Sequence, residues 1–335
     1  MFMKQDVWIP AICCLSFGAS GVYYCSLPVI EIFKGKVGLA ASLYNCAFDS
    51  SPLIFILYQT INSYTNWKLN SFFIWYNVIP FLVLILALIF PTEKEQFGEI
   101  DLEEENKQES EKDSLLGNEE EGKKQFVEYS GHYENSDFKT IFKVPFLYFL
   151  GLVFLVHVTF FTLYMGSIEF RMNKLTTDEE LSKRLVIIYS YIMPASFVLS
   201  PLIGYLLDKK GNAVTMIICH LIILSWCVCI MIEKWPYFQI VSFCLYSFGR
   251  PLFFTVILST IPKVFGFQKM GRIIAIISTL GAPIVFVQYA LVDLTVKKLD
   301  GNWLIPNLIQ LGFFLVCSLF LISVWKMLRN PPKTF

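Results

Sequence analysis

Charged residues are scarce in this sequence. Lys, Arg, Asp and Glu together make up 16% of the 335 residues, hydrophobic residues make up 55%, and the formal net charge is zero. A soluble globular chain has about a quarter charged residues, so the composition argues against that class. Because no basic arm or patch is present, the sequence offers no surface for nucleic acid.

Signatures of enzymes and of cofactor sites are also absent from the sequence. It contains no phosphate-cradling glycine loop, no nucleophile elbow and no His pair at metal-ligand spacing. The nine cysteines all fall within apolar segments, where a thiol behaves as a small hydrophobic group rather than as part of a disulfide framework. We therefore predict a protein that is not an enzyme and that uses no metal and no cofactor.

What the chain does contain is a series of long apolar runs. Each is about 20 residues or more, the length needed to cross roughly 30 Å of hydrocarbon at 1.5 Å per residue. In lipid a segment must satisfy its own backbone hydrogen bonds, so we expect helices. The sequence predicts an all-α, polytopic membrane protein of about nine spans, at residues 7–30, 37–63, 70–91, 141–167, 185–207, 212–232, 236–262, 270–293 and 303–328.

An acidic segment at 92–140 interrupts these runs. It is crowded with Glu and Asp and has few aromatic residues, so it cannot bury enough apolar surface to fold. We predict a disordered loop there, between a three-helix bundle at 1–91 and a six-helix bundle at 141–335. Without this loop, the numbers of Lys and Arg residues on the two sides of the membrane are nearly equal, and its lysines give its own side the excess. The positive-inside rule then places this loop and the C-terminus in the cytoplasm. Arg171 counts among the charges of the opposite side.

The same loop contains a candidate sorting signal. Glu111, Leu115 and Leu116 have the spacing of an acidic dileucine motif, although such a match arises easily by chance in an acidic segment. Sorting adaptors that bind this motif would direct the protein to a vacuolar or endosomal membrane. The plasma membrane stays open as an alternative.

A short segment between two predicted spans carries the first family resemblance. It reads Gly204-Tyr-Leu-Leu-Asp208-Lys209-Lys210-Gly211, where Gly211 allows a chain reversal and Asp208 can meet the positive end of a neighbouring helix. The segment resembles the signature loop of the major facilitator superfamily, which follows the second helix of each six-helix half. The resemblance implies that 141–167 is the seventh helix of the family's fold, that the chain starts at the fourth, and that the first three helices are missing from it.

A second resemblance is narrower. The run Arg250-Pro-Leu-Phe-Phe-Thr, followed by Lys263-Val-Phe-Gly-Phe-Gln-Lys-Met-Gly271-Arg272, is similar to the tenth helix and following loop of solute carrier family forty-three and its fungal and protist relatives. Phe48-Asp49-Ser50-Ser51 and Tyr164-Met-Gly166-Ser167 are weaker matches to that group. The resemblance implies a system-L-type carrier of neutral amino acids.

Two charges at mid-depth of their spans support a transport pathway independently. An unpaired Arg250 would cost at least about 2.5–3.5 kcal/mol there, and Pro251 removes one backbone hydrogen bond, so we expect the helix to open locally. Asp49 lies at the same depth in 37–63. One interpretation is that Asp49 receives the ammonium group of an amino acid and Arg250 its carboxylate. The other is that the two side chains pair with each other, or with nearby backbone, and fix helix packing.

The remaining candidates fall into two groups. Asn45 precedes Asp49 by four residues and is expected on the same helix face, and the other predicted pathway residues are Ser50, Ser51, Tyr164 and Ser167. For a conformational gate we expect Asp208 to contact Arg272 or the start of 270–293; the gate residues are Gly204, Asp208, Lys209, Gly211 and Arg272. Two histidines inside spans, His157 and His220, are interpreted as packing residues in preference to a proton relay.

The function predicted from these observations is secondary transport of small organic solutes, foremost neutral amino acids, by alternating access. Its partners would be the solute, membrane lipid and the sorting adaptors. The alternative is a non-transporting membrane scaffold or regulatory protein derived from a truncated carrier.

Overall fold

The computed structural model describes residues 8–33, 36–65, 67–89, 133 and 138–329, and the regular elements among them are helices. The acidic segment and its dileucine motif lie almost entirely outside the described residues. In chain order the elements are α1 (Trp8–Ser26), η2 (Leu27–Ile32), α2 (Val37–Ser50), α3 (Leu53–Thr65), α4 (Leu69–Tyr76), α5 (Val78–Ile89), α7 (Phe138–Ile141), α8 (Pro145–Leu175), α9 (Glu179–Ile192), η3 (Pro194–Leu199), α10 (Ser200–Cys229), η4 (Pro236–Phe238), α11 (Gln239–Phe265), α12 (Phe267–Val285), α13 (Val287–Lys298) and α14 (Leu304–Arg329).

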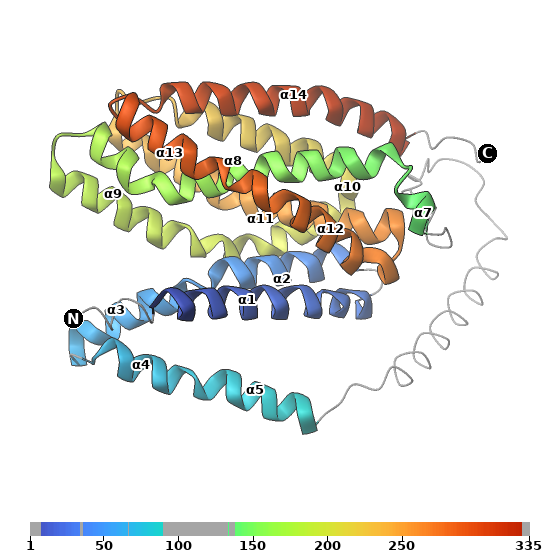
Figure 1. Ribbon diagram of the computed structural model, residues 1–335, viewed down its shortest axis with the longest axis horizontal. Coiled ribbons are helices and arrows are strands. Elements are labelled where there is room, and N and C mark those ends of the chain that lie inside the picture. Colours follow the sequence, from blue (N-terminus) through green and yellow to red (C-terminus); the bar gives the residue numbers. More distant parts are fainter. Residues whose placement is uncertain (1–7, 34–35, 66, 90–132, 134–137, 330–335) are drawn as a thin grey trace. The chain divides into compact units, whose positions relative to one another are not determined.

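The helices form two compact units. The larger one contains α1, η2, α2 and α7 to α14, and the smaller one contains α3, α4 and α5. Within the larger unit, α8 to α14 lie side by side as a bundle, and α2 packs against α10, α11 and η3 (Figure 1). The predicted domain boundaries at 91 and 141 stay a prediction.

The smaller unit is held together by aromatic side chains. The Tyr58 hydroxyl donates to the carbonyl of Trp67 at 3.2 Å, and its ring lies 5.1 Å from that of Phe72. Most of the apolar side chains of α5 are exposed, which suits a helix that faces lipid instead of water.

Several of the helices are long and apolar enough to cross a bilayer. Among the described residues there are four such stretches, or five if α2 and α3 are counted as one span. They are Pro145–Leu175, Glu179–Cys229, Pro236–Phe265 and Lys269–Lys298. Ser71–Leu86 and Leu304–Leu319 are shorter apolar helices. The finer prediction of nine spans stays a prediction.

Glycine and proline break the long helices in the bundle. Gly211 has φ 77° and ψ 164°, a conformation almost confined to glycine, and it divides α10 in two, which confirms the predicted reversal. Pro194 begins η3, which separates α9 from α10.

The predicted opening of the tenth-helix segment is wrong. α11 stays helical through Pro251, because its neighbours on every side bury nearly all residues from Pro251 to Phe265. Packing thus compensates for the one hydrogen bond that proline removes. The Ser247 hydroxyl donates at 2.9 Å to the carbonyl of Ile192, at the end of α9.

Candidate functional site

One face of α2 supplies the first half of the site. Its buried residues recur at helical spacing, and at the end facing η2 and α10 they are small, so that α2 can approach the bundle closely. Asn45 and Asp49 follow on the same face, as the sequence predicted. The buried positions are Gly38, Ala41, Ser42, Asn45, Cys46 and Asp49.

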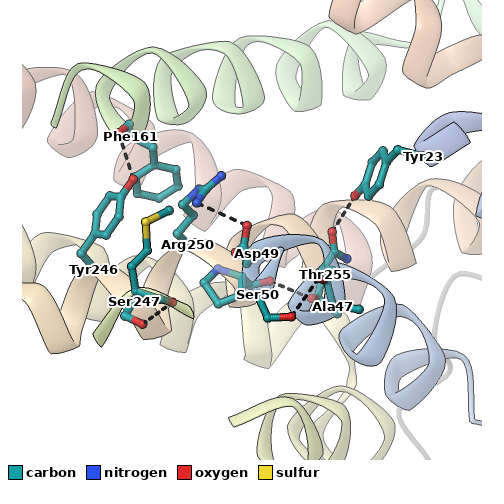
Figure 2. A network of polar contacts seen from close by, with 12 residues as sticks. Tyr23, Ala47, Asp49, Ser50, Phe161, Tyr246, Ser247, Arg250 and Thr255 are labelled. Atoms are coloured by element: carbon teal, nitrogen blue, oxygen red, sulfur yellow. Dashed lines mark hydrogen bonds and ion pairs between the residues drawn. The ribbon is translucent and has the colours of Figure 1, made fainter. Parts of the chain in front are cut away.

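Asp49 and Arg250 form an ion pair between α2 and α11. The Arg250 Nη1 and Asp49 Oδ1 atoms are 3.3 Å apart, and 14% and 6% of the two side chains are exposed. Figure 2 shows the carboxylate and the guanidinium facing each other from the two helices. The separation exceeds the roughly 2.7–2.9 Å of a charge-assisted hydrogen bond, so the contact is loose. Phe254, one turn further along α11, lies with its ring centre 5.8 Å from the guanidinium carbon.

A cavity of about 110 Å³ opens beside this pair. At its rim the Tyr23 hydroxyl of α1 donates to Asn45 Oδ1 at 2.7 Å, and the Asn45 amide donates to the Ala41 carbonyl at 2.9 Å (Figure 2 for Tyr23). The site therefore combines one cation, one anion, an amide and aromatic walls, the composition expected of a small polar solute's binding site. The lining residues are Tyr23, Tyr24, Asn45, Phe48, Asp49, Arg250 and Phe254.

The other predicted pathway residues do not line this cavity. The Ser50 hydroxyl donates to the Ala47 carbonyl of its own helix at 2.9 Å, and Ser51 lies exposed in the turn that follows α2. Tyr164 and Ser167 are buried inside the bundle around Arg171. Sequence reasoning missed Tyr23, for which the only signal was an aromatic doublet near the end of the first span.

The predicted gate contact is wrong in its partner. Asp208 does not contact Arg272, which is exposed. The Asp208 carboxylate accepts hydrogen bonds from the backbone amides of Gly38 at 2.9 Å and Leu39 at 3.1 Å. These amides belong to the first turn of α2, where the local N-cap, Lys36, provides no capping side chain. The general expectation that Asp208 meets the positive end of a helix is confirmed, with α2 as that helix.

Two glycines make this contact possible. A Cβ added to Gly38 would lie 2.5 Å from Asp208 Oδ1, and one added to Gly204 would lie 2.7 Å from the Cα of Leu39. Any larger side chain would push α2 and α10 apart. Lys209 lies outside this contact, with its ammonium 5.7 Å from the ring centre of Tyr205.

Arg171 is a second buried cation that sequence reasoning assigned to a loop. It lies in α8 and is 6% exposed. Its Nε donates to Ser167 Oγ and its Nη1 to Asn307 Oδ1, each at 2.9 Å. Its guanidinium carbon is 4.2 Å from the ring centre of Trp303 and 5.3 Å from that of Tyr164.

The two histidines make the contacts of packing residues. His157 is stacked between Phe253 and Phe314, with ring centres 4.3 Å and 4.6 Å away, and its Nδ1 lies 2.7 Å from the Val153 carbonyl. His220 Nε2 lies 2.7 Å from Ser318 Oγ. These hydrogen bonds and stacked rings favour the packing interpretation.

Comparison with known proteins agrees with this architecture. Residues 5–287 match the sequence profile of the Major Facilitator Superfamily. The chain is also 22% identical, over 321 residues, to Protein FMP42 of Saccharomyces cerevisiae, an alignment that covers 82% of this chain and 63% of FMP42. The chain thus spans less than two thirds of the length of that relative.

Proposed function

The chain belongs to the major facilitator superfamily, a family of membrane transporters and not of enzymes, and on that premise we propose that it carries neutral amino acids. Within the superfamily we assign it to the group around solute carrier family forty-three, on the tenth-helix run that begins at Arg250. We further propose that its nine apolar segments all span the membrane, with the acidic loop and the C-terminus in the cytoplasm. The dileucine motif would direct it to a vacuolar or endosomal membrane.

The observation that carries the proposal is the Asp49–Arg250 pair at the wall of a cavity. A zwitterionic amino acid presents one ammonium and one carboxylate, which match these two side chains in charge. Arg250 suits a carboxylate because its planar guanidinium can donate two parallel hydrogen bonds. Because the pair is loose, a bound amino acid can separate the two side chains, with its ammonium group against Asp49 and its carboxylate against Arg250. Neither buried charge is then left unpaired.

The same exchange links binding to movement. The Asp49–Arg250 pair joins α2 to α11, and Asp208 joins α10 to the N-terminus of α2. Once a substrate occupies Asp49 and Arg250, the direct attraction between α2 and α11 is replaced by two contacts to the ligand. The Asp208 cap and the buried hydrogen bond from the Ser42 hydroxyl to the Ser200 carbonyl still join α2 to α10. Both must break for α2 to move against α10, as alternating access requires.

Neutral rather than charged amino acids fit this site best. The cavity offers one positive and one negative group for the substrate's backbone charges, and the other lining groups are neutral: Tyr23, Tyr24, Asn45, Phe48 and Phe254. A second charge on the substrate side chain would face aromatic rings without a counter-charge, which is costly away from water.

Uptake by proteoliposomes tests this proposal. Vesicles that contain the purified chain should accumulate radiolabelled leucine, phenylalanine and methionine above protein-free vesicles, and Asp49→Asn and Arg250→Gln should each reduce uptake at least tenfold. Asp293→Asn is the matched control, since Asp293 forms an exposed ion pair with Lys297 in α13. If Asp49→Asn retains full uptake, Asp49 does not bind the substrate. If the wild-type chain shows no uptake of any amino acid, the scaffold alternative is favoured.

A further inference from the structure

The cavity beside Asp49 and Arg250 is smaller than most amino acids. It measures about 110 Å³, whereas a protein cavity of roughly 150 Å³ holds benzene, a molecule smaller than leucine. The cavity has room for an ammonium group, an α-carbon and a carboxylate, but a leucine side chain has to extend beyond its walls. For a carrier of neutral amino acids, the function on which this inference rests, part of the wall has to yield to the side chain.

The exposed part of the lining marks the mouth of the cavity. Among the described lining residues, Tyr24 of α1 and Phe48 of α2 are the exposed ones, at 38% and 46%. The others are buried or half-buried. A side chain that extends out of the cavity therefore meets the ring of Tyr24 or of Phe48, and either ring can move without opening the core behind it.

Of these two rings, Tyr24 is tied to a second helix. Its hydroxyl lies 3.3 Å from Ser278 Oγ of α12. This separation exceeds the roughly 2.5–3.0 Å of a normal O–H···O hydrogen bond, so the tie is weak and can be broken. Both exposed rings also contact Tyr23, with ring centres 5.3 Å away for Tyr24 and 4.7 Å away for Phe48. Phe48 has no hydroxyl with which to form a comparable tie.

We propose that Tyr24 sets the size limit for the substrate side chain. The hydrogen bond to Ser278 keeps the Tyr24 ring at the mouth, and a substrate with a small side chain, such as alanine, binds without moving it. A larger apolar side chain breaks this hydrogen bond and turns the ring outwards, which lowers the affinity for large substrates relative to small ones. Tyr24 thus acts on the side chain of the substrate, while its two charges stay with Asp49 and Arg250.

Competition with radiolabelled leucine for the purified full chain tests this limit. The measured quantity is the ratio of the inhibition constants of tryptophan and alanine, because any change in leucine binding cancels from this ratio. Tyr24→Ala removes the ring, so the ratio should fall about tenfold in favour of tryptophan. Tyr148→Ala replaces an exposed tyrosine of α8 that is outside the cavity lining, and this control should leave the ratio unchanged.

Two milder variants isolate the hydrogen bond. Tyr24→Phe and Ser278→Ala remove it from its two ends, so each should lower the ratio by the same factor, about threefold, and the double variant should lower it no further.

The outcomes separate the size limit from the proposed function. An unchanged ratio in Tyr24→Ala, with leucine still bound, would overturn the size limit and leave the proposed function intact. A ratio that responds to Phe48→Ala and not to Tyr24→Ala would place the limit at Phe48, and would overturn the proposal as well. A wild-type chain that binds no leucine would overturn the proposed function and the size limit together.

Discussion

Arg250 and Arg171 are two arginines buried in the same helix bundle, and they are stabilised in opposite ways. Arg250 faces a carboxylate from another helix and borders a cavity of about 110 Å³. Arg171 has neutral hydrogen-bond partners and two aromatic rings, and its cavity measures about 30 Å³. Asp49 therefore balances the charge of Arg250, and a solute can take the place of Asp49 as its partner. Arg171 depends instead on its planar guanidinium, which stacks on aromatic rings and donates to neutral oxygens.

The largest effect is expected from removing the counter-charge of Arg250. Asp49→Asn leaves this guanidinium buried and unpaired, so we expect a loss of about 3–5 kcal/mol in the free energy of unfolding. Chemical denaturation in detergent measures it. Asp293→Asn breaks only an exposed ion pair and should cost less than about 1 kcal/mol. Similar losses for both variants would show that burial does not strengthen the Asp49–Arg250 interaction.

A double substitution sharpens that result. Asp49→Asn combined with Arg250→Gln removes both charges and should be more stable than the sum of the two single losses predicts, by about 0.5–3 kcal/mol. Strictly additive losses would mean that the two side chains do not interact in solution.

A lysine in place of each arginine separates charge from shape. Arg171→Lys loses the planar stack on Trp303 and the bond from Nε to Ser167, and should cost about 1–3 kcal/mol in unfolding free energy. Arg250→Lys keeps a cation opposite Asp49 and should cost less. The same denaturation assay ranks the two variants, and the reverse order would contradict the contrast drawn between the sites.

The smallest effect is expected at Asp208, whose carboxylate accepts from two backbone amides at the start of α2. Asp208→Asn removes a charge from the N-terminus of α2 but keeps a hydrogen-bond acceptor, and should cost about 0.5–1 kcal/mol. In the uptake assay it should change the transport rate and leave the substrate preference unaltered. Asp178→Asn, at the N-cap of α9, is the control: a similar loss of stability is expected without a change in rate. An unaltered rate in Asp208→Asn would remove Asp208 from the gate.

Some of the site could be predicted from the sequence because the signal was local. A four-residue spacing places Asn45 and Asp49 on one helix face, and two opposite charges at equal depth predict a pair. The reversal at Gly211 also followed from residue chemistry, and the structure confirms it.

The parts that could not be predicted depend on which helices lie side by side. Asp208 caps a helix some 170 positions earlier in the chain, and the residues around Asp208 carry no signal that identifies this helix as its partner. Arg171 lies near a helix end, where a long basic side chain usually reaches water, so its burial depends on Trp303 and Asn307 at the start of α14.

The most direct test of the Asp49–Arg250 site is a comparison of leucine with its two half-charged analogues. Leucinol keeps the ammonium group and lacks the carboxylate, and 4-methylpentanoate keeps the carboxylate and lacks the ammonium. In competition with radiolabelled leucine for the purified chain, we predict that each analogue binds at least tenfold more weakly than leucine. We also predict that Asp49→Asn abolishes competition by leucinol and that Arg250→Gln abolishes competition by 4-methylpentanoate. If either analogue competes as well as leucine, the two charges do not recognise the two ends of the substrate.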